Sequence, residues 1–213
     1  MNTIYLIAIS QGFLLILFLG LKKHRNQANM LLAIWVASIC LSLGSSYLLA
    51  AGIVQEYPHL LGIDIALPLL CGPFLYLYVG LVIGDKENLK SLDFWHFSPF
   101  LIYLLILWIM LYSKNIDFKL SVLNRENHFM PNQYYFGIYA FSIFQAFIYS
   151  IKSFRIVMKT KLADINITYW LKGLIGFMLI VNTLFLFSLL GVLFPESIFR
   201  TISVTYLSIS FFF

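Results

Sequence analysis

The chain has 213 residues, of which 61% are hydrophobic and 11% are charged, and its formal net charge is +5. Soluble domains carry about a quarter of their residues as charged side chains, so this composition excludes an ordinary water-soluble fold and predicts a protein surrounded by lipid. One helical crossing of a bilayer takes roughly 20 apolar residues, and the chain offers runs of about that length repeatedly.

Seven apolar runs follow one another along the chain, separated by short polar segments. In chain order they cover residues 3–21, 29–53, 63–84, 97–113, 134–151, 169–194 and 198–213. The runs are continuous rather than alternating, which excludes the strands of a membrane barrel. The sequence therefore predicts an all-α polytopic membrane protein, a single domain built as a bundle of seven transmembrane helices.

Lysine and arginine are distributed unevenly between the two ends of such a bundle. Ten of them lie towards one side: Lys22, Lys23, Arg25, Lys86, Lys90, Lys152, Arg155, Lys159, Lys161 and Lys172. The other side holds four: Lys114, Lys119, Arg125 and Arg200. Positive residues in short loops stay in the cytoplasm, so the pattern predicts a cell-membrane protein with its N-terminus outside and its C-terminus towards the cytoplasm. No basic segment precedes the first run, so we expect a true span there rather than a signal peptide.

Small side chains recur on one face of the second span. Ser38, Ser42 and Ser46 are each four residues apart, a spacing that places them on the same side of a helix. Small residues allow another backbone to approach closely in a membrane. The stripe therefore predicts a helix-packing face rather than a binding site.

The third span contains two prolines in the stretch LPLLCGPFLYLY, residues 67–78. Proline removes a backbone donor, but neighbouring helices and hydroxyl groups can satisfy the freed carbonyls inside a membrane bundle. The sequence therefore predicts a helix that bends instead of ending, with Pro68, Gly72 and Pro73 as a candidate hinge. A kink of this kind opens space in which a ligand could sit, and a purely structural kink is the alternative.

Amide side chains lie near the middle of three spans. They are Gln11 in the first span, Gln145 in the fifth and Asn182 in the sixth. Together with Tyr76 they are the candidate residues of a ligand or signal pocket, as the polar floor of a small cavity that opens outward. Hydrogen bonding between helices is the alternative, because amides link membrane helices weakly.

Patterns typical of an enzyme or a metalloprotein are missing from the sequence. Four histidines lie apart, in loops or at span ends, without the spacing of metal ligands: His24, His59, His96 and His128. Cys40 and Cys71 fall inside spans, where a small packing residue is the default. We therefore predict a protein without catalytic residues, metal or cofactor.

The last apolar run is short for a crossing. Its sixteen residues, 198–213, reach about 24 Å at about 1.5 Å per residue, whereas the hydrocarbon core is about 30 Å thick. We expect this polypeptide to be a piece whose continuation completes the span and enters the cytoplasm. The alternative is a helix that begins near Glu196 in a locally thinned bilayer.

Three segments of the chain, NQANMLLAIWV, LPLLCGPFLYLYV and FWHFSPFLIYLL, carry a likeness to a known family. Through them the sequence resembles the membrane portion of bacterial regulators that have several N-terminal transmembrane helices and a cytoplasmic AraC-type helix-turn-helix domain. The resemblance implies a membrane sensor and anchor for a cytoplasmic DNA-binding domain. From this we expect a homodimer and an unknown small-molecule signal, extracellular or intramembrane. The signal would shift helix packing around the kink of the third span, and the seventh helix would pass the change on. The resemblance also implies that DNA is bound only through a cytoplasmic domain that this chain does not contain.

A small seven-helix solute transporter or permease is the alternative function. Such proteins bind solute near the midplane, often on broken helices that recur in both halves of the chain. Spans five and six contain no proline that corresponds to Pro68 and Pro73. The sequence therefore favours the regulator over the transporter, and it does not name the signal.

Overall fold

The structure is a computed structural model, and it describes residues 2–21, 26–62, 66–84, 86, 88–123, 132–160 and 164–193. Every regular element within these residues is helical, which confirms the predicted all-α class. The seventh predicted span, 198–213, lies outside the described residues.

The long helices follow the predicted apolar runs, and several short helices lie between them. Their bounds are α1 (Asn2–Leu21), α2 (Gln27–Ala50), η1 (Ile53–Gln55), η2 (Pro58–Leu60), α4 (Pro68–Val82), η3 (Ser91–Phe97), α5 (Ser98–Leu107), η4 (Trp108–Tyr112), α6 (Ile116–Leu123), α7 (Asn132–Lys159) and α8 (Ile165–Leu193). The η4 segment is a π-helical continuation of α5. The short helix α6 was not predicted, and α7 extends eight residues beyond the expected end at residue 151.

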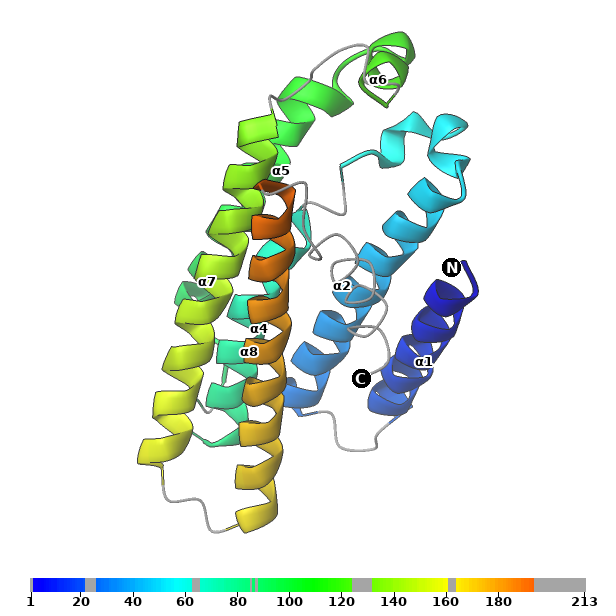
Figure 1. Ribbon diagram of the computed structural model, residues 1–213. Helices are drawn as coiled ribbons and strands as arrows, with labels where there is room; N and C mark the ends of the chain where they lie inside the picture. Colours follow the sequence, from blue (N-terminus) through cyan, green and yellow to red (C-terminus); the bar gives the residue numbers. More distant parts are fainter. Residues whose placement is uncertain are drawn as a thin grey trace.

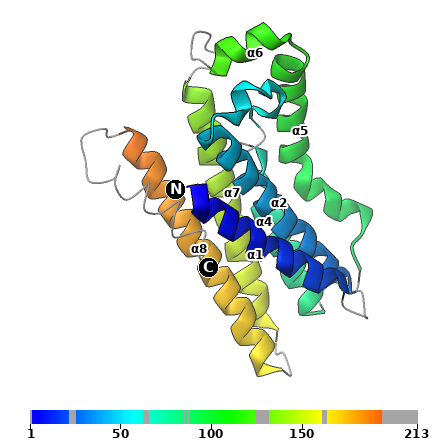
Figure 2. The same ribbon diagram turned by 90° about the vertical axis from the view of Figure 1, so that its right-hand side faces the viewer.

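The long helices run alternately down and up in Figure 1, so that consecutive helices are antiparallel. In packing order, α1 contacts α2, α2 contacts α4, α4 contacts α7, and α7 contacts α8. Figure 2 shows α4 and α7 between α5 on one side and α8 on the other. α1, α4 and α7 end at the lower end of the bundle in Figure 1, and η1, η2 and α6 share the upper end.

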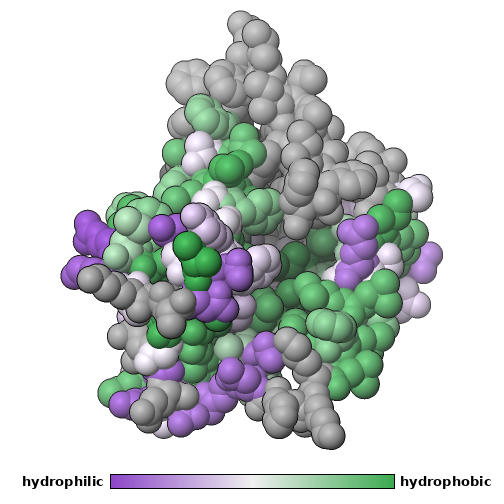
Figure 3. All heavy atoms as spheres, turned by 90° about the horizontal axis from the view of Figure 1, so that it is seen from below, coloured by the Kyte–Doolittle hydropathy of each residue, from purple (hydrophilic) through white to green (hydrophobic). Residues whose placement is uncertain are grey.

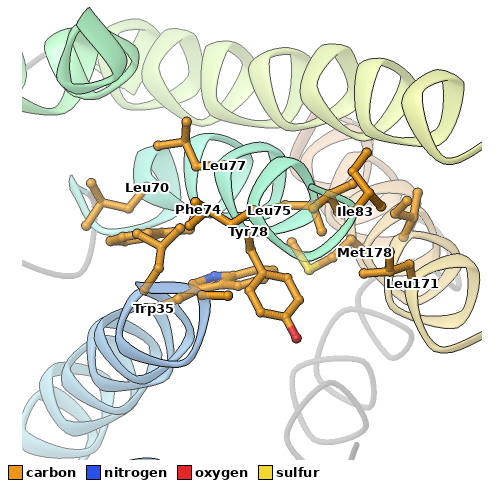
Figure 4. Packing of buried hydrophobic residues seen from close by; sticks show 14 of the residues in the cluster. Trp35, Leu70, Phe74, Leu75, Leu77, Tyr78, Ile83, Leu171 and Met178 are labelled. Atoms are coloured by element: carbon orange, nitrogen blue, oxygen red, sulfur yellow. The ribbon is translucent and has the colours of Figure 1, made fainter. Parts of the chain in front are cut away.

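The main hydrophobic core lies around α4. Leu75 and Val79 of this helix are completely buried, and Leu77 is 1% exposed. Figure 4 shows Phe74 and Tyr78 packed near Trp35 of α2, with Leu171 and Met178 of α8 at the other end of the cluster. A helix that is apolar on all sides must be buried or surrounded by lipid, and α4 is buried between its neighbours.

The outer helices expose large apolar side chains over much of their surface. Examples are Phe13, Leu14 and Phe18 on α1 and Leu101 and Leu105 on α5. In the part of the chain that the structure describes, three helical segments are long and apolar enough to cross a membrane: Gln27–Ala50, Ser91–Tyr112 and Ile165–Phe187. Tyr5–Leu21 and Pro68–Val82 are shorter apolar helices. These helices support a membrane location for the chain.

The structure differs from the sequence prediction at Pro68. Leu67 lies in a turn and α4 begins at Pro68, so the expected uninterrupted helix from residue 63 is not formed. Proline is favoured in the first helical turn, where its missing N–H would have no partner in any case. Pro73 lies inside α4, which continues to Val82. Ala66 is also helical, so the helix is interrupted at Leu67 and resumes at Pro68, whereas it passes through Pro73 as predicted.

The predicted serine stripe of α2 is only partly a packing face. Ser38 is buried, and its hydroxyl donates to the carbonyl of Trp35 at 2.7 Å, whereas Ser42 and Ser46 are half-buried. A close approach of α1 to α2 lies at another position, because a Cβ on Gly12 would meet the Cys40 sulfur. Gly12 thus provides the small surface that allows these two helices to pack.

Candidate functional site

The structure separates the residues of the predicted ligand pocket. Gln11 is exposed on α1, a helix whose main contact is α2. Asn182 is buried on α8, where its amide donates to the Met178 carbonyl of the same helix at 2.7 Å. Gln145 is buried on α7, and Tyr76 of α4 belongs to a different group of side chains. The four residues do not form a common polar floor.

Gly72 lies at a point where α4 and α7 approach each other closely. A Cβ added at Gly72 would lie 2.7 Å from Cδ2 of Tyr149 and 3.3 Å from the Ala146 Cα atom. The second distance matters most, because a backbone atom cannot rotate away. Gly72, next to Pro73, therefore sets the spacing between the two central helices.

Three aromatic rings meet just below this crossing, and we call them the Tyr76–His96–Tyr149 cluster. Their ring centroids are 5.3 Å apart for Tyr76 and His96, 5.5 Å for His96 and Tyr149, and 5.6 Å for Tyr76 and Tyr149. These separations and the tilted or edge-on orientations are favourable for aromatic pairs. The His96 Nδ1 atom lies 2.8 Å from the Tyr149 hydroxyl. The cluster thus connects α4, η3 and α7.

Charged groups surround the cluster at the lower end of the bundle. The Lys152 ammonium lies 5.8 Å from the centroid of the Tyr149 ring, within the range of a cation–π contact. Asp93, three residues before His96, is only 6% exposed. Its carboxylate accepts from the Lys86 ammonium and, at 2.8 Å, from the Lys90 amide. A buried carboxylate needs such partners, and here they fold residues 86–93 back upon themselves.

The same segment is attached to α2. The Leu89 amide donates to the Gln27 side-chain oxygen at 2.8 Å, which joins the loop after α4 to the first residue of α2. Figure 3 shows hydrophilic residues at this lower end, beside extensive hydrophobic surface. The lower end therefore combines positive charge with a fixed polar loop, directly next to the Tyr76–His96–Tyr149 cluster.

We expect Tyr149→Phe to weaken the cluster without disturbing the packing of the ring. Removing the hydroxyl deletes the hydrogen bond to His96, a loss of about 1 kcal/mol in unfolding free energy. Tyr169→Phe is a matched control, because the Tyr169 side chain is largely exposed on α8. Denaturant titration of the purified protein in detergent, followed by circular dichroism, measures both. Equal stabilities for the two variants would contradict a structural role of the His96 contact.

A second polar group lies at the upper end of the bundle. Lys119 of α6 is only 1% exposed, although it is a lysine. Its ammonium lies 2.9 Å from Nδ1 of His59 and donates to the Tyr112 carbonyl at 3.0 Å. The Tyr112 hydroxyl in turn donates to the Leu61 carbonyl at 3.0 Å. These contacts attach α6 to η2 and to the end of η4.

Sequence reasoning missed both polar groups for the same reason. His96 and Tyr149 are 53 residues apart, and His59 and Lys119 are 60 residues apart, so no local spacing relates them. The sequence indicated only that both histidines lie near span ends. A buried lysine in a short segment between two apolar runs gives no signal of its own.

A cavity of about 450 Å³ lies between α4, α5 and α7. None of the predicted pocket residues contributes to it. Its walls are formed by Leu69, Pro99, Ile102, Tyr103, Ile106, Gly137, Ile138 and Phe141. The cavity is therefore apolar, in contrast to the polar pocket that the sequence suggested.

Within the described residues, no three or more His, Cys, Asp or Glu side chains lie close enough together to hold a metal ion. The polar contacts described above are between side chains, or between side chains and backbone, and they fix one element to another. Comparisons of the chain with protein-family models, with curated proteins and with solved structures found no match.

Proposed function

We propose that this chain is the membrane-embedded sensor and anchor of a transcription regulator with an AraC-type helix-turn-helix domain. The chain crosses the membrane seven times in this proposal, with its N-terminus outside. The DNA-binding domain lies beyond residue 213 and is reached through the seventh helix. The protein is a regulator, not an enzyme, and is active as a homodimer.

The observation that carries the membrane part of the proposal is the distribution of positive residues on the antiparallel helices. Among the described residues, six lie towards the lower end: Lys86, Lys90, Lys152, Arg155, Lys159 and Lys172. The upper end has Lys114 and Lys119, and the second of these is buried. Since positive residues are retained in the cytoplasm, the lower end is the cytoplasmic one. The AraC-type domain rests on the resemblance of the three sequence segments alone.

The central helices supply the route for the signal in this proposal. A change in the packing of α4 against α7 at Gly72 and Pro73 moves Tyr76 and Tyr149, which contact His96. From α7 the change passes to α8, its packing partner, and then to the seventh helix. A ligand can drive such a change only if it binds one packing arrangement more tightly than the other.

Reporter fusions test the topology. A reporter fused behind Gly84 or behind Thr160 is expected to be active on the cytoplasmic side, and one behind Ser113 on the external side. Alkaline phosphatase and a fluorescent protein make a suitable pair, because each is active on only one side of the membrane. The opposite pattern at any of the three positions would contradict the proposed orientation.

The downstream gene sequence tests the regulatory part. We expect the reading frame to continue beyond codon 213 into a basic, helical segment of about 100 residues or more, the usual size of a domain. An immediate stop codon would favour the small transporter instead. In that case uptake of a panel of solutes into liposomes that contain the protein is the next measurement.

A further inference from the structure

The cavity between α5 and α7 has the shape of a groove that runs along the helices. Its α5 wall consists of Pro99, Ile102, Tyr103 and Ile106, a spacing of three, four and seven residues that marks one face of a helix. Seven residues of helix extend over about 10 Å. The opposite wall comes from residues 137–141 of α7, and Leu69 of α4 closes the bottom.

The groove opens sideways, in the direction that the outer helices present to lipid. Ile102 is 59% exposed and Phe141 is 50% exposed at its rim, whereas Leu69 is only 3% exposed at its bottom. Gly137 has no side chain to narrow the groove on the α7 side, and a Cβ at this position would meet no heavy atom within 4 Å. A molecule dissolved in the bilayer can therefore enter without passing through a polar end of the bundle.

The chemistry of the walls restricts what the groove can hold. All eight wall residues are apolar except for the hydroxyl of Tyr103, and none is charged. A polar or ionic ligand would lose its hydration there without gaining partners, which costs several kcal/mol in general. The bound part of a ligand is therefore hydrocarbon.

The volume fits one hydrocarbon chain. An apolar protein cavity of about 150 Å³ holds one benzene, which has six carbon atoms, so the 450 Å³ of this groove corresponds to roughly 18 carbon atoms. That is the size of one long acyl chain and too small for the two chains of a phospholipid.

We propose that this groove binds a free long-chain fatty acid, a single-chain amphiphile that enters from the bilayer. The proposal rests on the membrane location in the proposed function and names the chemical class of its signal. Leu69 and Tyr103 of the groove also belong to a second hydrophobic cluster with Ala66, Leu107 and Leu111, and Ile138 of the groove and Phe118 of α6 pack against this cluster. A bound fatty acid therefore changes the spacing of α5 from α4 and α7, and this change also moves α6.

Photolabelling of the full chain in lipid nanodiscs tests the proposal. The probe is a palmitic acid that carries a diazirine on its tail, and labelled peptides are mapped by mass spectrometry. We expect label to concentrate on residues 99–106 and 137–141 and to be displaced by excess palmitate. Gly137→Phe fills the groove and is expected to lower labelling about tenfold, because the new ring takes the place of several buried methylene groups.

Two further variants keep the test independent of misfolding. Gly173→Phe is the matched control, since Gly173 also lies in a long helix with nothing within 4 Å of an added Cβ; it is expected to label like the native chain. Ile106→Trp fills the groove from the opposite wall at a partly exposed position and is expected to reduce labelling as Gly137→Phe does. Both groove variants should melt at the same temperature as the control.

Two results would overturn the proposal. Label spread evenly over the exposed faces of α1, α5 and α8, and unchanged in Gly137→Phe, means that only surrounding bulk lipid was labelled. A photoreactive phosphatidylcholine that labels the same peptides and is not displaced by palmitate means that a two-chain lipid occupies the groove. Neither result affects the orientation that the reporter fusions measure. Conversely, if no DNA-binding domain follows, a positive labelling result still supports the groove proposal.

Discussion

Gly72→Ala is expected to destabilise the protein by about 1–3 kcal/mol, the usual cost of forcing an extra methyl group into a packed interface. The new Cβ would lie 3.3 Å from the Ala146 Cα atom and 2.7 Å from the Tyr149 ring. The ring can rotate, but the backbone of α7 must move away. Displacing Tyr149 also weakens its contact with His96, so the two effects add. Thermal or denaturant unfolding in detergent measures the loss.

Gly173→Ala on α8 is the control for this substitution. Gly173 is exposed, and an added Cβ meets nothing within 4 Å. Alanine has a higher helix propensity than glycine by about 1 kcal/mol, so this variant should be unchanged or more stable. If Gly72→Ala is as stable as Gly173→Ala, α4 and α7 do not approach each other closely at Gly72.

The second large effect is expected from Asp93→Ala. The substitution leaves the Lys86 ammonium without its carboxylate and the Lys90 amide without its acceptor. The Lys86 side chain is 24% exposed and Lys90 is exposed, so water replaces part of each lost contact and each hydrogen bond is worth about 0.5–1.5 kcal/mol. Because the segment also bonds to Gln27 of α2, we expect faster proteolysis between α4 and α5 together with the loss in stability.

A double-mutant cycle separates the ion pair from the rest of this effect. Lys86→Met removes the charge and keeps most of the side-chain volume, so Asp93→Ala should cost less in its presence, by about 0.5–3 kcal/mol. Asp117→Ala is the control, because Asp117 is exposed on α6. Additive effects of the two substitutions would show that the pair contributes nothing to stability.

The predicted elements that the structure reproduces depend on local signals. Continuous apolar runs predicted α1, α2, α5, α7 and α8, and most of the helix ends lie within a few residues of the prediction. The reason is that a helix pairs all backbone N–H and C=O groups within one apolar segment. The continuation of α4 through Pro73 follows from the same physics. At Pro68 the helix is interrupted, since Leu67 lies in a turn between helical Ala66 and α4.

The candidate sites could not be predicted in the same way. Gln11, Gln145 and Asn182 are equivalent in sequence, each an amide within an apolar run, yet Gln11 is exposed while Gln145 and Asn182 are buried. The difference depends on which face of each helix meets a neighbour. In an apolar helix no amphipathic period marks that face, because lipid and protein neighbours are equally apolar.

The sequence by itself determined the helical class, the approximate positions of the helices, and the segregation of positive residues to one end. These properties follow from composition and order along the chain. Only the tertiary structure decided that Gly72 meets Ala146, that His96 meets Tyr149, and that Lys119 is buried beside His59. Such contacts join residues far apart in the chain, and they form only when helices choose their neighbours, which packing decides and local hydrophobicity does not.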